Sequence, residues 1–244
     1  MRLTRVHVPG PLATGRSCTV EGDAAHHIAR VLRLAAGDML TVFDGGGGEY
    51  AGRIEAMGKG TVVVQVGERC AVERESPLSL TLAQGVSRGE RMDWVVQKAV
   101  ELGVSRLVPV LTERSVVRLD PRQALSKQRH WQGIAIAACE QCGRDRVPEV
   151  AVPVPLAELL HGLGAGGSRL LLSPEGTATL EDLGPPQATL TVLIGPEGGL
   201  SEGERRAARA QGFQALRLGP RVLRTETAAV VALAVLQHRF GDLS

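Results

Sequence analysis

The feature that most constrains the fold is an alternation of short apolar runs with amphipathic helical stretches, which begins near residue 78 and continues almost to the end of the 244-residue chain. The apolar runs are predicted strands at residues 78–83, 106–111, 169–172, 190–194 and 215–218. The predicted helices cover residues 90–102, about 121–142, 201–210 and 225–240, and the first two are expected to end at Gly103 and Gly143. Apolar runs of this length are typical of strands that helices cover on both faces. The alternation therefore predicts a mainly parallel sheet in an α/β domain.

The first seventy or so residues have a different pattern, with short strands and tight turns. Strands are predicted at residues 39–43, 50–54 and 61–66, after one helix that begins at a capping Asp23. The glycine run 45–48 between the first two of these strands indicates a hairpin. Such a pattern predicts a compact β-barrel.

The boundary between the two patterns is a charged segment that ends at Pro77. Charge and proline together are typical of a linker. We therefore expect a small β domain over residues 1–73 and an α/β domain over residues 74–244.

Composition excludes few functions. The formal net charge is +2, so charge alone does not indicate a nucleic-acid-binding protein. Aromatic residues make up only 2%, which disfavours recognition by rows of aromatic side chains that stack on bases. No apolar run is long enough to cross a bilayer, and the N-terminal residues lack the apolar stretch of a secretory signal. We therefore expect a cytoplasmic protein without a membrane partner.

Two cysteines, Cys139 and Cys142, have the spacing of half a zinc site or of a redox pair. The sequence offers no second close cysteine pair to complete a zinc site. Both residues also fall late in a predicted helix, whereas a reactive thiolate is favoured at an exposed helix start. We interpret both as structural and expect no metal.

The first candidate binding loop follows the predicted strand 190–194. It contains Gly195, Gly198 and Gly199, which permit positive φ angles and a close approach of the backbone to a ligand. Ser201 then begins a capping box that fixes the start of the next helix. Three glycines and a proline exceed what a tight turn requires, and open parallel sheets bind ligands beyond the carboxyl ends of their strands. The pattern favours a binding loop over a simple turn.

Nucleotide triphosphates and NAD are disfavoured as ligands of this loop. No Gly-Lys-Ser/Thr ending follows, and the dinucleotide pattern G-x-G-x-x-G does not fit. Glu197 would also repel a pyrophosphate. A ligand with a neutral ribose and a cationic centre suits backbone amides and carbonyls beside a carboxylate better.

A second candidate loop follows the last predicted strand. Gly219 ends that strand, Thr225 is a predicted helix cap, and Arg221, Arg224 and Glu226 gather at the entrance of the last helix. An exposed cluster of ion pairs with a cap is the simpler interpretation. Two such loops after neighbouring strands nevertheless favour a functional site.

The two loops together carry a family resemblance. Ile194-Gly-Pro-Glu-Gly-Gly199 followed by Leu218-Gly-Pro-Arg-Val-Leu-Arg-Thr-Glu-Thr-Ala228 resembles the ribosomal RNA small subunit methyltransferase E family, of the knotted SPOUT class. Further matching segments stand in the expected order at residues 97–103, 112–115 and 138–144, and at 27–38 for an N-terminal PUA-like domain. The resemblance covers nearly the whole chain. The glycine run 45–48 is longer than the family pattern leads us to expect.

The resemblance implies a fold and an activity that periodicity does not show. The C-terminal domain would form a trefoil knot, and the N-terminal domain a small PUA-like β-barrel. The implied enzyme is a homodimer that uses S-adenosylmethionine to methylate N3 of a specific uridine in 16S ribosomal RNA. Its partner would be small-subunit ribosomal RNA or the assembled 30S subunit.

The resemblance also implies cofactor-binding residues, and the chemistry of the implied reaction suggests catalytic and RNA-binding candidates. Those expected to bind the cofactor are Leu172, Ile194, Gly195, Pro196, Glu197, Gly198, Gly199, Leu200, Leu218, Gly219, Leu223 and Arg224. Those expected to act in catalysis are Arg224, Glu226 and Arg5, because a guanidinium can stabilise a uracil anion and a carboxylate can accept the N3 proton. Those expected to bind RNA are Arg30, Arg33, Arg88, Arg114 and Arg118. A phosphate contact or a surface ion pair is the alternative role for each catalytic arginine, and a solvated basic face is the alternative for the arginines expected to bind RNA.

Two other functions stay open. A related knotted methyltransferase could act on a ribose hydroxyl in transfer RNA, and the product nucleoside would distinguish it. An RNA-binding accessory factor that has lost catalysis would not bind the cofactor.

Overall fold

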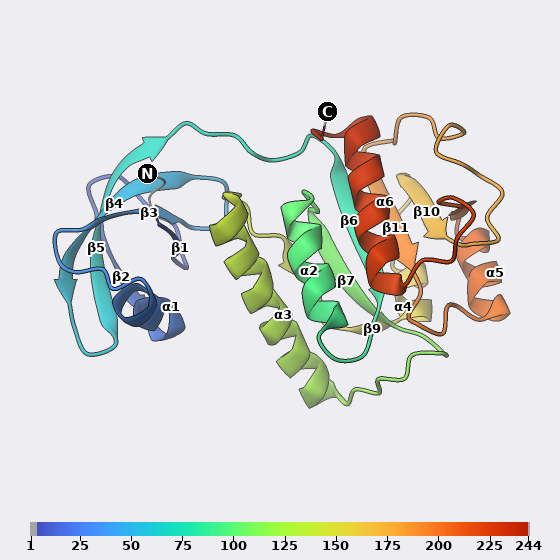
Figure 1. Ribbon diagram of the computed structural model, residues 1–244, viewed down its shortest axis with the longest axis horizontal. Helices are drawn as coiled ribbons and strands as arrows, with labels where there is room; N and C mark the ends of the chain where they lie inside the picture. The colour runs from blue at the N-terminus through green and yellow to red at the C-terminus, as the bar shows by residue number, and fades with distance from the viewer. Residues whose placement is uncertain (1–3, 244) are drawn as a thin grey trace. The chain divides into compact units, whose positions relative to one another are not determined.

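The computed structural model describes residues 4–243, which form two compact units (Figure 1). The first unit comprises residues 4–75 together with Ile136–Val147, and the second comprises Ser76–Ala135 and residues 148–243. The sequence places a single boundary after residue 73. It does not anticipate that residues 136–147 pack with the first unit.

The first unit is built on a five-stranded sheet of order β1-β3-β4-β5-β2. Its strands are β1 (Arg5–His7), β2 (Ser17–Glu21), β3 (Met39–Phe43), β4 (Glu49–Met57) and β5 (Thr61–Cys70). β1 and β3 are parallel, and the other pairs are antiparallel. Two register shifts between β4 and β5 curl the sheet. A short helix, α1 (Gly22–His26), continues into a π-helical turn, η1 (His27–Val31).

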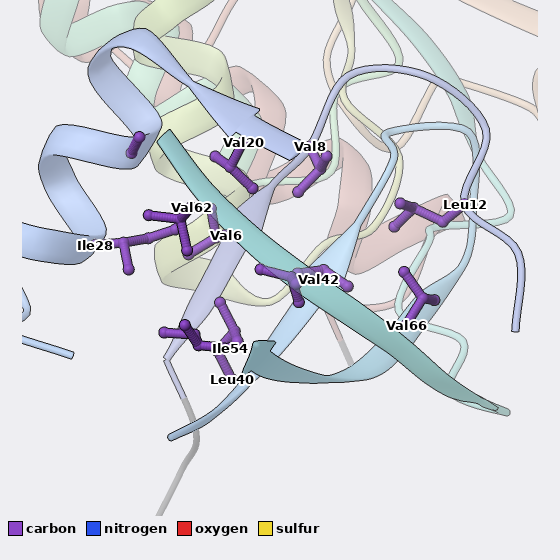
Figure 2. Close-up of a cluster of buried hydrophobic side chains, with 12 residues drawn as sticks. Val6, Val8, Leu12, Val20, Ile28, Leu40, Val42, Ile54, Val62 and Val66 are labelled. Carbon is purple, nitrogen blue, oxygen red and sulfur yellow. The ribbon is translucent and has the colours of Figure 1, made fainter. Parts of the chain in front are cut away.

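One hydrophobic cluster fills the curl of this sheet. Figure 2 shows valine, leucine and isoleucine side chains from β1, β2, β3, β4, β5 and η1 that point toward one another. Ile28 and Leu40 are fully buried there. The predicted small β unit is confirmed. The predicted cap is wrong, because Glu21 precedes α1 without a side-chain cap bond and Asp23 lies within the first turn.

The glycine run 45–48 pairs with the segment that the first unit takes from later in the chain. Val147 N donates to Gly45 O at 3.1 Å, and Gly47 N donates to Asp145 O at 3.3 Å. Gly47 has a φ of 103°, and an added Cβ would lie 2.7 Å from the Arg146 guanidinium carbon. Positive φ angles therefore account for Gly45 (81°) and Gly47 (103°) in this run.

The second unit contains a seven-stranded sheet whose paired strands are parallel, with the path β12-β10-β11-β6-β7-β8 and with β9 paired to β7. Its strands are β6 (Ser79–Gly85), β7 (Arg106–Leu111), β8 (Glu149–Val150), β9 (Val154–Pro155), β10 (Ser168–Leu172), β11 (Thr189–Ile194) and β12 (Gln214–Leu216). Its helices are α2 (Arg91–Glu101), α4 (Leu156–His161), α5 (Glu202–Ala210) and α6 (Thr225–Phe240). Helix α3 (Pro121–Cys142) begins in this unit and ends in the first.

Helices cover both faces of this sheet, as the apolar strands predict. α2 and α6 lie side by side on one face, and α4 and α5 pack together on the other (Figure 1). Leu193 and Ala83 of the central strands share a core with Phe213 and with Leu160 of α4. The α/β prediction is confirmed. The trefoil knot stays a prediction.

Helix boundaries follow local signals. Gly103 (φ 75°) and Gly143 (φ 99°) follow the ends of α2 and α3, as predicted. Ser201 and Glu204 form both bonds of the predicted capping box at α5. The two-residue strands β8 and β9 and the six-residue α4 had no such signal. Within residues 4–243, no helix has the length and apolar character needed to cross a membrane.

Candidate active site at the carboxyl ends of the parallel strands

A cavity of about 550 Å³ lies in the second unit at the carboxyl ends of β10, β11 and β12. Its walls are the end of β10, the loop 195–200 after β11, the loop 217–224 and the first turn of α6. This volume is that of a typical small-molecule site. Open parallel sheets bind their ligands beyond the carboxyl ends of their strands, which is where this cavity lies.

All the residues expected to bind a cofactor line this cavity, with the exception of Gly198. They are Leu172, Ile194, Gly195, Pro196, Glu197, Gly199, Leu200, Leu218, Gly219, Leu223 and Arg224. Glu226, expected in catalysis, lines it as well. The fold thus brings both candidate loops to one cavity, and the role of each residue there stays a prediction.

The loop 195–200 is a tight turn fixed by its glycines. Gly199 N donates to Pro196 O at 2.8 Å, and Gly199 has a φ of 67°, which favours glycine. An added Cβ at Gly195 would lie 3.0 Å from Leu200 N. Both glycines therefore let the backbone itself form the cavity wall.

Gly198 lies against Arg114. An added Cβ at Gly198 would lie 3.1 Å from the Arg114 Cβ, and Arg114 Nη1 donates to Gly198 O at 3.2 Å. A side chain at this position would push on the loop after β7. The structure thus gives Gly198 a packing role.

Glu197 is tied to the start of α2. Its Oε1 accepts from the Arg88 backbone at 3.0 Å and from Arg91 Nη1 at 2.8 Å. Burial opposes its charge, but hydrogen bonds from its own backbone, from the Arg88 amide and from Arg91 lower the pKa of Glu197 overall. The carboxylate that the sequence assigns to a cationic ligand is thus neutralised by Arg91.

Glu226 is the other carboxylate at the cavity. Its Oε1 lies 3.9 Å from Arg91 Nε, while its Oε2 is buried and has no hydrogen-bond partner among residues 4–243. The side chain is 17% exposed. Glu226 thus brings to the cavity lining a carboxylate in which one oxygen accepts no hydrogen bond from the described protein.

Arg224 and Arg221 line the cavity and are exposed. Neither side chain has a hydrogen bond or ion pair to another described residue. Arg224 precedes α6 without capping it by a side chain. The predicted cap at Thr225 is wrong, because Thr225 is the first residue of α6 and its hydroxyl donates to Gly195 O at 2.7 Å.

Arg5 lies in the first unit, where it is buried. It forms an ion pair with Glu49 and donates from Nη2 to Arg144 O at 3.0 Å. Arg74 also contacts Glu49 at 3.0 Å and donates to Gly143 O at 2.9 Å. These two arginines satisfy carbonyls just beyond the end of α3, which is a structural role that the sequence did not reveal. A catalytic role for Arg5 stays a prediction.

The arginines expected to bind RNA are exposed. Arg30 lies in the last turn of η1, Arg33 comes two residues after its end with a φ of 55°, and both belong to the first unit. Arg88, Arg114 and Arg118 lie on loops that follow β6 and β7 in the second unit.

Several cavity residues were missed by sequence reasoning. Arg91, Ser173 and Arg205 line the cavity. Arg91 lies in the first turn of α2, where the helical spacing of apolar residues identifies core positions but gives no sign of a polar residue at a cavity. Arg205 lies four residues after Ser201 and donates to Leu200 O at 3.1 Å, so helical spacing from the capping box was the available signal.

Two family models match the chain. The RNA methyltransferase domain matches residues 74–237, and the RNA methyltransferase PUA domain matches residues 20–67. Ribosomal RNA small subunit methyltransferase E from Buchnera aphidicola (subsp. Schizaphis graminum) is 32% identical over 100% of this chain and 99% of its own.

Two solved structures are similar over their whole length. A putative methyltransferase from Legionella pneumophila, in complex with bound S-adenosylmethionine, shares 42% identity with a TM-score of 0.94, and the match covers 100% of both chains. Ribosomal RNA small subunit methyltransferase E from Neisseria gonorrhoeae, bound to S-adenosylmethionine, shares 36% identity with a TM-score of 0.93 at the same coverage.

The cavity therefore lies at the strand ends of a matched RNA methyltransferase domain, and a PUA domain match falls within the curled β unit. Identity above 30% extends over the full length of a curated relative. The chain belongs to the ribosomal RNA small subunit methyltransferase E family.

Proposed function

We propose that this chain uses S-adenosylmethionine to methylate N3 of a specific uridine in 16S ribosomal RNA. The single observation that carries the proposal is the convergence of the loops 195–200 and 217–224 on one cavity. Family membership and the cofactor bound in two similar structures support it.

The residues present fit the cofactor. Leu172, Leu218 and Leu223 provide apolar wall, and the glycine-rich loop provides backbone at the surface of the cavity. S-adenosylmethionine, when bound, would supply the methyl group on its sulfonium sulfur: the uridine N3 takes the methyl carbon in line, the carbon–sulfur bond breaks, and S-adenosylhomocysteine leaves. Glu226 is the carboxylate that we assign to the incoming base, because its Oε2 has no partner within residues 4–243 whereas Glu197 is already paired with Arg91.

The protein must hold the uridine and remove its N3 proton. We assign the proton to Glu226 Oε2, which is buried and has no donor of its own within residues 4–243. We assign to Arg224 the stabilisation of negative charge on the uracil, because its guanidinium lies at the cavity and makes no ion pair within the described chain. Positioning supplies the rest of the rate.

RNA binding is assigned to arginines on both units. Arg30 and Arg33 would contact phosphates from the first unit, and Arg88, Arg114 and Arg118 from the second. Binding would then weaken steeply as salt rises, because each phosphate contact releases counterions. The substrate would be small-subunit ribosomal RNA or the assembled 30S subunit, which places the enzyme in the cytoplasm.

A homodimer is the proposed assembly. Helix α6 is apolar around its whole circumference, but Val230, Val231, Ala234 and Val235 form an outward stripe that the chain only partly buries. A helix that is apolar on all sides is normally buried on all sides. A second copy of the chain would cover this stripe.

The experiment is transfer of labelled methyl groups from S-adenosylmethionine to purified 30S subunits, to naked 16S ribosomal RNA and to transfer RNA. We expect label in small-subunit RNA and none in transfer RNA. Label confined to transfer RNA would mean that transfer RNA is the substrate in place of small-subunit ribosomal RNA. Absence of label together with absence of S-adenosylhomocysteine binding in calorimetry would favour an RNA-binding factor without catalysis.

A further inference from the structure

Two consecutive buried hydrogen bonds connect the cavity loop 195–200 to β6 and α6. Gln84 of β6 pairs with Ile194 of β11, one residue before the loop, and is completely buried. Its Nε2 donates to Thr225 Oγ1 at 2.8 Å and to the neighbouring Gly85 O at 3.1 Å. The Thr225 hydroxyl in turn donates to Gly195 O at 2.7 Å. Three segments distant in sequence thus meet through one hydroxyl.

The held group is the peptide between Gly195 and Pro196. This peptide has no N–H, because proline lacks one, so the carbonyl is its only hydrogen-bonding group. Thr225 occupies that carbonyl. Gly85 packs against the same peptide, since an added Cβ there would lie 2.4 Å from Pro196 N. The peptide is therefore fixed on one side by packing and on another by a hydrogen bond.

Stability alone does not explain Gln84. Its Oε1 is buried and has no hydrogen-bond partner within residues 4–243. Burial of an unpaired amide oxygen costs free energy, so an apolar residue of similar size would suit the interior of this sheet better. The amide has a specific role at this position. Because the Gln84 Nε2 donates to the Thr225 hydroxyl oxygen, the hydroxyl proton of Thr225 is directed to the Gly195 carbonyl.

We infer that Gln84 and Thr225 are positioning residues that set the conformation of the loop 195–200 for the cofactor. Gln84 acts through Thr225, and Thr225 acts through the Gly195 carbonyl. The inference rests on the proposed function, because it takes S-adenosylmethionine as the ligand of this loop. It assigns no proton transfer to either residue.

The test compares T225V with T225S. The valine keeps the shape and removes the hydroxyl, whereas the serine keeps the donor. We expect T225V to bind S-adenosylhomocysteine about tenfold more weakly in calorimetry, the size of one lost buried hydrogen bond, and T225S to stay near wild type. We also expect KM for S-adenosylmethionine to rise in T225V while kcat at saturation changes little.

T81V is the matched control. Thr81 lies on β6, the strand that carries Gln84, and its hydroxyl makes no hydrogen bond within the described chain. We expect wild-type affinity. Equal binding by wild type and T225V would overturn the inference, while absence of binding by the wild type would instead overturn the proposed function.

Q84M separates positioning from stability. The substitution removes the unpaired buried oxygen together with the donor to Thr225. We expect weaker S-adenosylhomocysteine binding at an unchanged melting temperature. A lower melting temperature with unchanged affinity would mean that Gln84 is only structural, and this result would overturn the inference even if T225V failed to fold.

Discussion

At the residue scale, two glutamates at one cavity differ because their partners differ. Glu226 lines the cavity, and its buried Oε2 has no donor among the described residues. The Oε1 of Glu197 accepts hydrogen bonds from the Arg88 amide and from Arg91. A carboxylate that already accepts two hydrogen bonds is a poor proton acceptor, because those bonds favour the charged form. Glu226 is therefore the candidate base and Glu197 the anchor of the loop.

E226Q tests the assignment of the base. Glutamine keeps the shape but cannot accept the N3 proton, so we expect kcat to fall by about 100-fold or more. S-adenosylhomocysteine affinity should stay near wild type in calorimetry. E158Q, a change on an exposed residue of α4, is the matched control. Full activity of E226Q in single-turnover methylation would show that the proton leaves by another route.

The ion pair of Glu197 has a pH dependence whose sign follows from its pKa. Because hydrogen bonds lower the pKa of Glu197 below its ordinary 4.5, its contribution to stability is fully present above that pH. The contribution is lost as the pH falls through the folded pKa. We expect wild type to melt above E197Q at neutral pH, with a difference that shrinks in acid. A difference that stays constant between about pH 3 and 7 would contradict this account.

At the scale of elements, glycine has opposite effects on stability at two positions. Gly85 ends β6 directly against the peptide of the cavity loop, where a Cβ would lie 2.4 Å from a backbone nitrogen. Gly133 lies in the middle of α3, and a Cβ there would meet nothing within 4 Å. Glycine is thus required by packing at the first position and costs helix stability at the second.

A pair of alanine substitutions measures this contrast. G85A should lower the free energy of unfolding by about 1–3 kcal/mol, because backbone must move. G133A should raise it by about 0.5–1 kcal/mol. Urea unfolding of both variants gives the two values. A stable G85A with normal cofactor affinity would show that the loop tolerates displacement.

Local signals were readable in sequence, and long-range ones were not. The capping box at Ser201 and the glycine stops after α2 and α3 involve residues within one or two turns, so spacing alone predicted them. Thr225 was assigned as a cap because it precedes an apolar helix, but its hydroxyl bonds a carbonyl 30 residues away. The role of the glycine run 45–48 likewise depends on a partner about 100 residues later.

At the scale of the whole molecule, the sequence predicted both units but not their composition. Strand periodicity identified the parallel sheet, and the strand-end rule located the cavity where the two candidate loops meet. Arg91 escaped, because its ion pairs with Glu197 and Glu226 join segments more than 100 residues apart. The end of α3 joins the first unit through the buried Arg5 and the more exposed Arg74, and composition cannot distinguish these two from surface charges.

The apolar stripe on α6 gives a prediction about assembly. V231D places a charge on the stripe, so we expect sedimentation velocity to show a shift from dimer to monomer. V152D, at a valine that is 39% exposed elsewhere in the second unit, is the control and should stay dimeric. A wild-type monomer at micromolar concentration would contradict the proposed dimer.

The most direct test of the central claim is the identity of the modified nucleoside. Purified 30S subunits would be incubated with the enzyme and S-adenosylmethionine, and their RNA would be digested and analysed by nucleoside mass spectrometry, with E226Q as the control. The account predicts new 3-methyluridine with wild type and little with E226Q. A 2′-O-methylated nucleoside, or another methylated base, in place of 3-methyluridine would contradict it.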